Sequence, residues 1–288
     1  MKRTVALCLI LIIFTPKTAF CFATIEYFMQ NRSNGYFLIE QLSIPIITYH
    51  LITEDHRLWS NFSTSPEQLE EDFKLLNNSG FKTISLDELS ELYILLNDPN
   101  VLKNKYKVFT LIDEYKNSVV LTSDDGYSSD YIYILPLMKK YNVKFNFFVV
   151  GDLIDKKGYL TSEEIKNMAT NPLVTIGNHS NKLHHFDVNK VRAMYSSSEY
   201  NQMIVDDFMS ANKILNPLIN KSPSFLSYPY GEYSQSVDTE LKNNGFLLRL
   251  TTNGGFADPF SNNTNIGRIN RSNCMSSLDL INTIKNLK

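Results

Sequence analysis

The sequence predicts a mixed α/β fold, specifically an incomplete or distorted (β/α) barrel of about seven parallel strands. Short apolar runs rich in β-branched and aromatic residues alternate along the chain with segments of helical spacing. This alternation is typical of a parallel sheet with crossover helices. The chain has 288 residues, 43% of them hydrophobic, which is enough apolar material for one large core. A barrel accommodates about seven strand–helix units, and an open doubly wound sheet is the alternative.

The predicted strands are short apolar runs that end at turn-forming or polar residues. In chain order they are Ile44–His50, Val119–Asp124, Val143–Val150, Leu173–Asn178, Phe225–Tyr230, Phe246–Thr251 and Asn265–Ile269.

The helices are predicted from apolar residues that recur on one face. In the first helix Ser65 is expected to cap the N-terminus, with Pro66 at the first helical position and Gln68 completing a capping box. The predicted helices are Ser65–Asn78, Leu86–Leu96, Ser129–Tyr141, Ser162–Ala169, Val191–Leu215 and Ser236–Asn243. The segment Asn97–Asn117 is largely polar and is expected to be a surface excursion rather than a domain boundary.

The N-terminus predicts export. Lys2 and Arg3 precede an apolar run from Val5 to Phe14, and the segment Thr-Ala-Phe-Cys-Phe-Ala follows and ends at Ala23. This order is typical of a secretory signal peptide, so we expect residues 1–23 to be a leader and residues 24–288 to form one catalytic domain. The apolar run is shorter than the roughly 20 residues that span a bilayer, which disfavours a retained anchor. Lipidation at Cys21 is a further alternative.

The charge balance disfavours one class of partner. The formal net charge is −2, and nucleic-acid binding depends on clustered Lys and Arg that this balance lacks. We therefore expect no nucleic-acid partner, and a polymer without strong negative charge is an easier partner for this chain.

Polar residues fall at the ends of several predicted strands. They are His50, the pair Asp124–Asp125, the pair Asn178–His179, and the segment Tyr228–Gly231. In a parallel barrel these ends share one face, which is where barrel enzymes build their sites. The sequence therefore predicts that these side chains meet.

The two adjacent carboxylates could divide two roles between them. Neighbouring side chains at a strand end point to opposite sides unless the chain bends, and Gly126 allows that bend after Asp124 and Asp125. One carboxylate could then hold a metal while the other accepts a proton. Taken alone, Asp-Asp-Gly is more simply explained as a solvated turn.

Three of the five histidines lie in one short stretch, at His179, His184 and His185. Imidazoles at positions 179 and 184, on a loop leaving a strand, can converge on one divalent ion. With Asp125 they make an Asp-His-His set that leaves coordination positions for water and substrate.

Several ordered motifs resemble the polysaccharide deacetylases, the carbohydrate esterases with a NodB-homology domain. Thr122–Gly126 is similar to their Thr-Phe-Asp-Asp-Gly motif, and His179–His184 resembles the longer histidine motif of biofilm poly-N-acetylglucosamine deacetylases. The entry strand Ile44–His50, the segment Phe81–Leu89 and the Tyr-Pro-Tyr-Gly at Tyr228–Gly231 resemble the same subgroup. The resemblance extends from about Ile44 to Arg268.

The resemblance implies a role for each matching residue. It implies Asp124 as general base and the backbone N–H of Tyr230 as a donor to the oxyanion. It implies His50 as the acid that protonates the leaving amine. The implied metal ligands are Asp125, His179 and His184. The implied cofactor is a divalent metal, with Zn²⁺ as the default and Co²⁺, Ni²⁺ or Fe²⁺ as alternatives.

The sequence departs from the family pattern beside the base. Ser123 replaces the usual Phe, and Ser227 stands where many members have an Arg that steadies the base. Arg268 is a candidate substitute partner for Asp124. These departures affect the surroundings of the predicted base, Asp124, more than the type of reaction.

Aromatic residues near the motifs are candidates for substrate contact, because an aromatic face suits the apolar face of a sugar ring. The candidates are Trp59, Tyr127 and Tyr228. Core packing is an equally good explanation for Trp59, and the tyrosines after position 127 also fit a helix face. His56 and His185 are expected to be bystanders.

The resemblance implies an exported hydrolase of N-acetyl groups on poly-N-acetylglucosamine or a similar exopolysaccharide. The same machinery acting on peptidoglycan, chitin oligomers or O-acetyl xylan is the nearest alternative. An alternative of another class is a sugar-binding envelope protein without activity. A glycoside hydrolase is disfavoured, because the adjacent Asp124 and Asp125 would not straddle a glycosidic bond.

Overall fold

The structure, a computed structural model, describes residues 42–185, 196–261 and 263–287. Its main sheet is built from six parallel strands, and their order across the sheet is the same as their order along the chain. These strands are β1 (Ile44–Tyr49), β5 (Ser118–Ser123), β6 (Phe145–Val149), β7 (Val174–Asn178), β8 (Phe225–Ser227) and β9 (Leu248–Leu250). The runs predicted from the sequence therefore supply the sheet.

Two short strands near the C-terminus connect the two edges of this sheet. β11 (Asn265–Ile266) pairs with β9, and β12 (Ile269–Asn270) pairs with β1, both in parallel. Between them lies Gly267, where an added Cβ would lie 1.6 Å from the carbonyl oxygen of Asn253. The sheet is therefore nearly closed and barrel-like, which confirms the predicted fold class over the open alternative.

Three further pairings extend this framework. β10 (Phe256–Ala257) runs antiparallel to β1, and β4 (Lys82–Thr83) runs parallel to β5. A separate two-stranded sheet joins β2 (Leu51–Ile52) to β3 (Ser63–Thr64).

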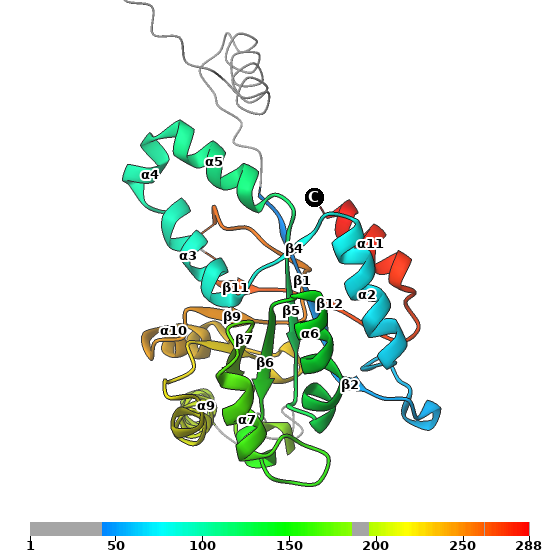
Figure 1. Ribbon diagram of the computed structural model, residues 1–288. Helices are drawn as coiled ribbons and strands as arrows, with labels where there is room; N and C mark the ends of the chain where they lie inside the picture. Colours follow the sequence, from blue (N-terminus) through cyan, green and yellow to red (C-terminus); the bar gives the residue numbers. More distant parts are fainter. Residues whose placement is uncertain (1–41, 186–195, 262, 288) are drawn as a thin grey trace, which may run out of the picture. The chain divides into compact units, whose positions relative to one another are not determined.

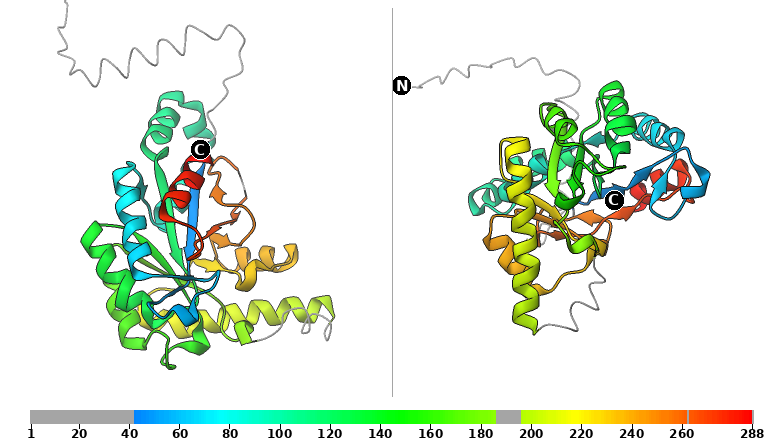
Figure 2. Two further views of the ribbon diagram at one scale, coloured as in Figure 1. Left: turned by 90° about the vertical axis from the view of Figure 1, so that its right-hand side faces the viewer. Right: turned by 90° about the horizontal axis from the view of Figure 1, so that it is seen from below.

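Helices cover the outside of the barrel (Figures 1 and 2). α11 contacts α2, α2 contacts α6, and α9 contacts both α7 and α10. Their bounds are α2 (Pro66–Asn78), α3 (Leu86–Leu96), α6 (Leu135–Tyr141), α7 (Ser162–Ala169), α9 (Ser197–Ile219), α10 (Gln235–Asn243) and α11 (Ser277–Asn286). The capping box expected at Ser65 is present, since its side chain accepts from the backbone of Gln68 while the Gln68 side chain accepts from the backbone of Ser65.

The structure differs from the sequence prediction between positions 97 and 117. That segment contains two helices, α4 (Pro99–Lys103) and α5 (Lys105–Tyr115). Val101, Val108 and Ile112 are buried there. Val108 and Ile112, four residues apart, lie on one face of α5, which the polar majority of the segment conceals in the sequence.

The predicted helix 129–141 has two parts. A π-helical turn, η2 (Asp130–Ile134), precedes α6. Pro136 lies at the start of α6, and because proline has no backbone N–H, the hydrogen-bond ladder cannot continue regularly through it.

The predicted leader, residues 1–23, lies outside the described residues, as does Val191, the predicted start of α9. Among the helices of the described part of the chain, none is both long and apolar enough to cross a membrane.

A buried ion pair links α2 to the C-terminal segment, and hydrogen bonds join the first strand to it. Arg271 is fully buried and donates to both carboxylate oxygens of Asp72 on α2, at 2.7 and 3.0 Å. The Tyr49 hydroxyl also donates to Asp72, at 3.0 Å. The Arg271 backbone N–H bonds to the carbonyl of Thr48 in β1. This cluster holds the end of β1, where His50 follows, against α2.

Candidate metal centre

The two carboxylates lie where β5 ends. The Asp124 N–H donates to the Tyr49 carbonyl at 3.0 Å, which continues the pairing with β1 for one residue. Asp125 and Gly126 then take φ values of +74° and +71°. Such positive φ values are unfavourable for most residues other than glycine. They bend the chain here, so the Asp125 side chain points away from the direction that a continued strand would give it.

The histidine loop follows β7 and is held by hydrogen bonds to α9. Asn178 donates to the Phe208 carbonyl at 2.8 Å and to the Asn212 side chain at 2.7 Å. Asp207 accepts from the backbone N–H groups of residues 181, 182 and 183. The short helix η4 (Leu183–His185) then carries His184 back toward the strand end.

Three potential ligand atoms converge at the mouth of the barrel. His184 Nε2 lies 3.0 Å from Asp125 Oδ1, and His179 Nε2 lies 3.4 Å from the same oxygen. The two Nε2 atoms are 3.2 Å apart. One ligand atom from each of the three residues lies within 4.8 Å of the others. The structure thus brings together the three residues predicted as ligands.

The donor chemistry of this cluster fits a divalent cation. His179 is placed to donate from Nδ1 to the Ser227 carbonyl at 2.8 Å, and this tautomer leaves a lone pair on Nε2. Asp125 Oδ1 is buried without a hydrogen bond of ordinary geometry among the described residues. Lone pairs that face one another in a buried site are compensated by a cation.

The electrostatics of the site favour positive charge. Burial by itself would lower the pKa of His179, but the carboxylates of Asp124 and Asp125 raise it overall. Burial would raise the pKa of Asp125, but the neighbouring histidines hold it well below its usual range. The same negative field would attract a metal ion.

Asp124 is paired with Arg268. The guanidinium donates to both carboxylate oxygens at 2.7 Å, and the Ser227 hydroxyl donates to one of them at 3.0 Å. Arg268 and Asp124 are both buried. Burial would raise the pKa of Asp124, but Arg268 holds it far below the ordinary value. Arg268, from the C-terminal segment, thus supplies a guanidinium to Asp124 and also donates to the Ser227 hydroxyl, at 2.8 Å.

His50 follows β1 beside these groups. Its ring packs edge-on against Phe62, with centroids 5.1 Å apart. Its Nδ1 is buried and forms no hydrogen bond with the described residues. Burial lowers the pKa of His50, and the nearby Asp124 and Asp125 partly oppose that effect.

Tyr230 lies in η5 (Pro229–Gly231) with a φ of +60°. Its hydroxyl donates to the His184 carbonyl at 3.2 Å, and the two rings lie 5.2 Å apart. The turn therefore places the Tyr230 backbone next to the histidine loop. Its function as an oxyanion donor remains a prediction.

The three aromatic residues proposed to contact substrate differ in exposure. Trp59 is 40% exposed and its ring contacts His56, with centroids 3.9 Å apart. Tyr127 is half-buried and stacks on Tyr159. Tyr228 is buried, and its hydroxyl donates to Asp238 at 2.9 Å. The burial of Tyr228 argues for a structural role, so its substrate contact remains only a prediction.

His185 lies apart from the three ligand atoms and pairs instead with Asp152, at 3.1 Å. Sequence reasoning missed Asp207 and the contact of Ser227 with both Asp124 and His179. A polar residue on the amphipathic helix α9 gives no signal that separates a loop anchor from a solvated side chain.

Comparison with known families agrees with this geometry. The model of the polysaccharide deacetylase family matches residues 112–248, the part of the chain that contains both carboxylates and both histidines. This part of the chain is therefore similar to polysaccharide deacetylase domains of the NodB type, a class of hydrolases that act on N-acetyl amide bonds and generally depend on a metal.

Individual relatives are distant. A Bacillus subtilis protein named as a polysaccharide deacetylase, YxkH, is 25% identical over 214 residues, which cover 74% of this chain and 66% of that protein. The poly-β-1,6-N-acetyl-D-glucosamine N-deacetylase of Escherichia coli K12 is 22% identical over 244 residues, which cover 74% of this chain and 34% of that protein. The chain thus spans about two thirds of the first relative and one third of the second.

A solved structure shows the same fold. IcaB from Ammonifex degensii superimposes with a TM-score of 0.69 at 20% identity, covering 84% of this chain and 97% of that one.

Proposed function

We propose that the protein is a metal-dependent hydrolase that removes N-acetyl groups from an amino-sugar polysaccharide, with poly-β-1,6-N-acetylglucosamine as its substrate. The observation that carries this proposal is the convergence of Asp125, His179 and His184 beside a separate carboxylate, that of Asp124. The names of the distant relatives support the choice of polymer.

Each group has a role that its position supports. A divalent cation held by Asp125, His179 and His184 would supply Lewis-acid chemistry, which polarises a carbonyl and makes water more acidic. Asp124, kept ionised and oriented by Arg268, would accept the proton of the attacking water. The Tyr230 N–H would stabilise negative charge on the carbonyl oxygen.

His50 would donate a proton to the departing nitrogen, without which an amine is a very poor leaving group. We expect His50→Ala to reduce acetate release from N-acetylated oligomers by about 10²–10⁴-fold. An aryl acetate has a leaving group that needs no protonation, so its hydrolysis should fall much less. Steady-state rates on both substrates test this, and equal losses on both would contradict the role of His50.

The substrate can be tested directly with the metal-loaded protein. We expect acetate release from β-1,6-linked N-acetylglucosamine oligomers to exceed release from chitin oligomers, peptidoglycan or O-acetyl xylan. A chelator should abolish release, and added Zn²⁺ should restore it. A different preferred glycan would identify one of the alternative substrates. No release from any glycan, with binding retained, would instead identify a sugar-binding envelope protein.

Zinc is our proposal for the metal because the Asp-His-His set suits it, although such sites also accept Co²⁺, Ni²⁺ or Fe²⁺. Metal analysis of the protein purified from its natural host distinguishes these ions. Export through a leader at residues 1–23 likewise remains a proposal from the sequence.

A further inference from the structure

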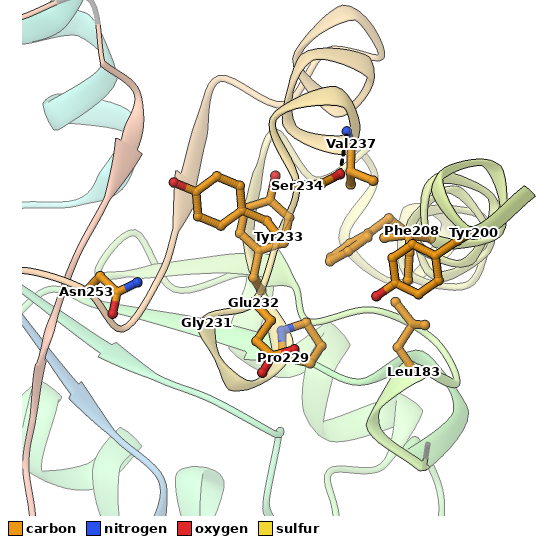
Figure 3. A pocket seen from close by; sticks show the side chains of 12 residues that line it. Leu183, Tyr200, Phe208, Pro229, Gly231, Glu232, Tyr233, Ser234, Val237 and Asn253 are labelled. Atoms are coloured by element: carbon orange, nitrogen blue, oxygen red, sulfur yellow. Dashed lines mark hydrogen bonds between the residues drawn. The ribbon is translucent and has the colours of Figure 1, made fainter. Parts of the chain in front are cut away.

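A pocket of about 320 Å³ lies next to the candidate metal centre. Figure 3 shows Leu183 and Tyr200, from η4 and α9, on one side of the pocket and Glu232 and Tyr233, which follow η5, on the other. We call it the Glu232 pocket. Its volume is at the lower end of the range of about 300–1,000 Å³ that small ligands occupy.

The pocket and the metal centre share a wall. Leu183 lines the pocket and precedes the predicted ligand His184. Pro229 and Gly231 also line it and flank Tyr230, whose hydroxyl donates to the His184 carbonyl. A polymer with one sugar at the metal centre could therefore place a neighbouring sugar here.

The lining has one charge and several aromatic rings. Glu232 is the single Asp, Glu, Lys, Arg or His among the twelve lining residues. Its side chain is exposed, and its carboxylate has no ion pair within the described part of the chain. The aromatic lining residues are Tyr200, Phe208, Tyr228 and Tyr233. Aromatic faces bind sugar rings and also attract cations.

We propose that the Glu232 pocket binds a sugar of the same polymer that has already lost its acetyl group. This inference rests on the proposed function, whose product is a primary amine that is protonated at neutral pH. An ammonium group complements the Glu232 carboxylate, whereas a neutral N-acetyl group leaves that carboxylate without a partner. The pocket would thus favour removal of an acetyl group close to an existing free amine.

The test compares two β-1,6-linked N-acetylglucosamine oligomers of equal length, one fully acetylated and one with a single free amine. We expect the amine-bearing oligomer to have a kcat/KM about threefold higher, which is ordinary for an ion pair open to solvent. Glu232→Gln should remove this preference and Glu232→Lys should reverse it. Added salt should weaken the preference in the wild-type protein.

Glu240→Gln is the matched control, because Glu240 is exposed on α10 and does not line the pocket; it should retain the preference. Calorimetry adds a readout that does not depend on turnover: a fully deacetylated oligomer should bind Glu232→Gln about threefold more weakly than wild type. Two results together would overturn the assignment of the Glu232 pocket but not the proposed function. They are equal acetate release from both oligomers by the wild-type protein and unchanged binding of the deacetylated oligomer by Glu232→Gln. Absence of acetate release from both oligomers would overturn the proposed function.

Discussion

Replacement of His179 by alanine is expected to remove the bound metal and reduce acetate release to background. His179 is buried and contributes one of three converging ligand atoms. Loss of one ligand from a three-residue set leaves too few protein donors to hold a divalent ion tightly. Metal content after dialysis, measured together with acetate release, tests this expectation.

His185→Ala is the matched control for this prediction. His185 is close to His184 in sequence, but its ring pairs with Asp152 instead of the ligand cluster. The control should keep both metal and activity. Full activity in His179→Ala would remove the basis for the proposed metal centre, and loss of metal in both variants would indicate damage to the histidine loop as a whole.

Asp124→Asn is expected to bind metal but to turn over about 10²–10⁴-fold more slowly, because the amide cannot accept the proton of water. The substitution also leaves the buried Arg268 without a counterion, which costs about 3–5 kcal/mol of unfolding free energy. Rates should therefore be measured well below the melting temperature, with metal content determined on the same sample.

A second buried pair controls for this loss of stability. Asp238 accepts two hydrogen bonds from Arg249, at 2.6 and 2.9 Å, and both residues are buried. Asp238→Asn should lose comparable stability, measured by urea unfolding, yet keep most of its turnover. If both variants lost activity to the same extent, the loss in Asp124→Asn would be a consequence of instability and Asp124 would not be the base.

Much of the fold could be predicted from the sequence because the strand signal is local. Each main strand is a short apolar run, and its polar end marks the face where the site lies, as at Asp124 and His179. The closure of the barrel could not be predicted in the same way. The sequence predicts one strand at Asn265–Ile269, but the structure divides this segment into β11 and β12, of two residues each. β12 pairs with β1, at the other end of the described chain, and no local pattern specifies that partner.

The candidate site shows the same limit. The side chains predicted as ligands come together because strand ends of a parallel barrel share one face. The contacts that hold them do not follow from that rule. Asp207 anchors the histidine loop from α9, and Ser227 contributes a carbonyl to His179 and a hydroxyl to Asp124. Both depend on packing between distant segments, which spacing along one segment does not reveal.

The contacts of Arg268 have a consequence for how the protein is made. This guanidinium bonds to Thr48, 220 residues earlier in the chain, and to Asp124, 144 residues earlier. Such distant pairings form slowly, because loop-closure entropy is lost before the contacts are gained. On the ribosome, β1 can pair with β12 only after Asn270 has been synthesised. A nascent chain would therefore hold an unpaired Asp124 until Arg268 has been synthesised.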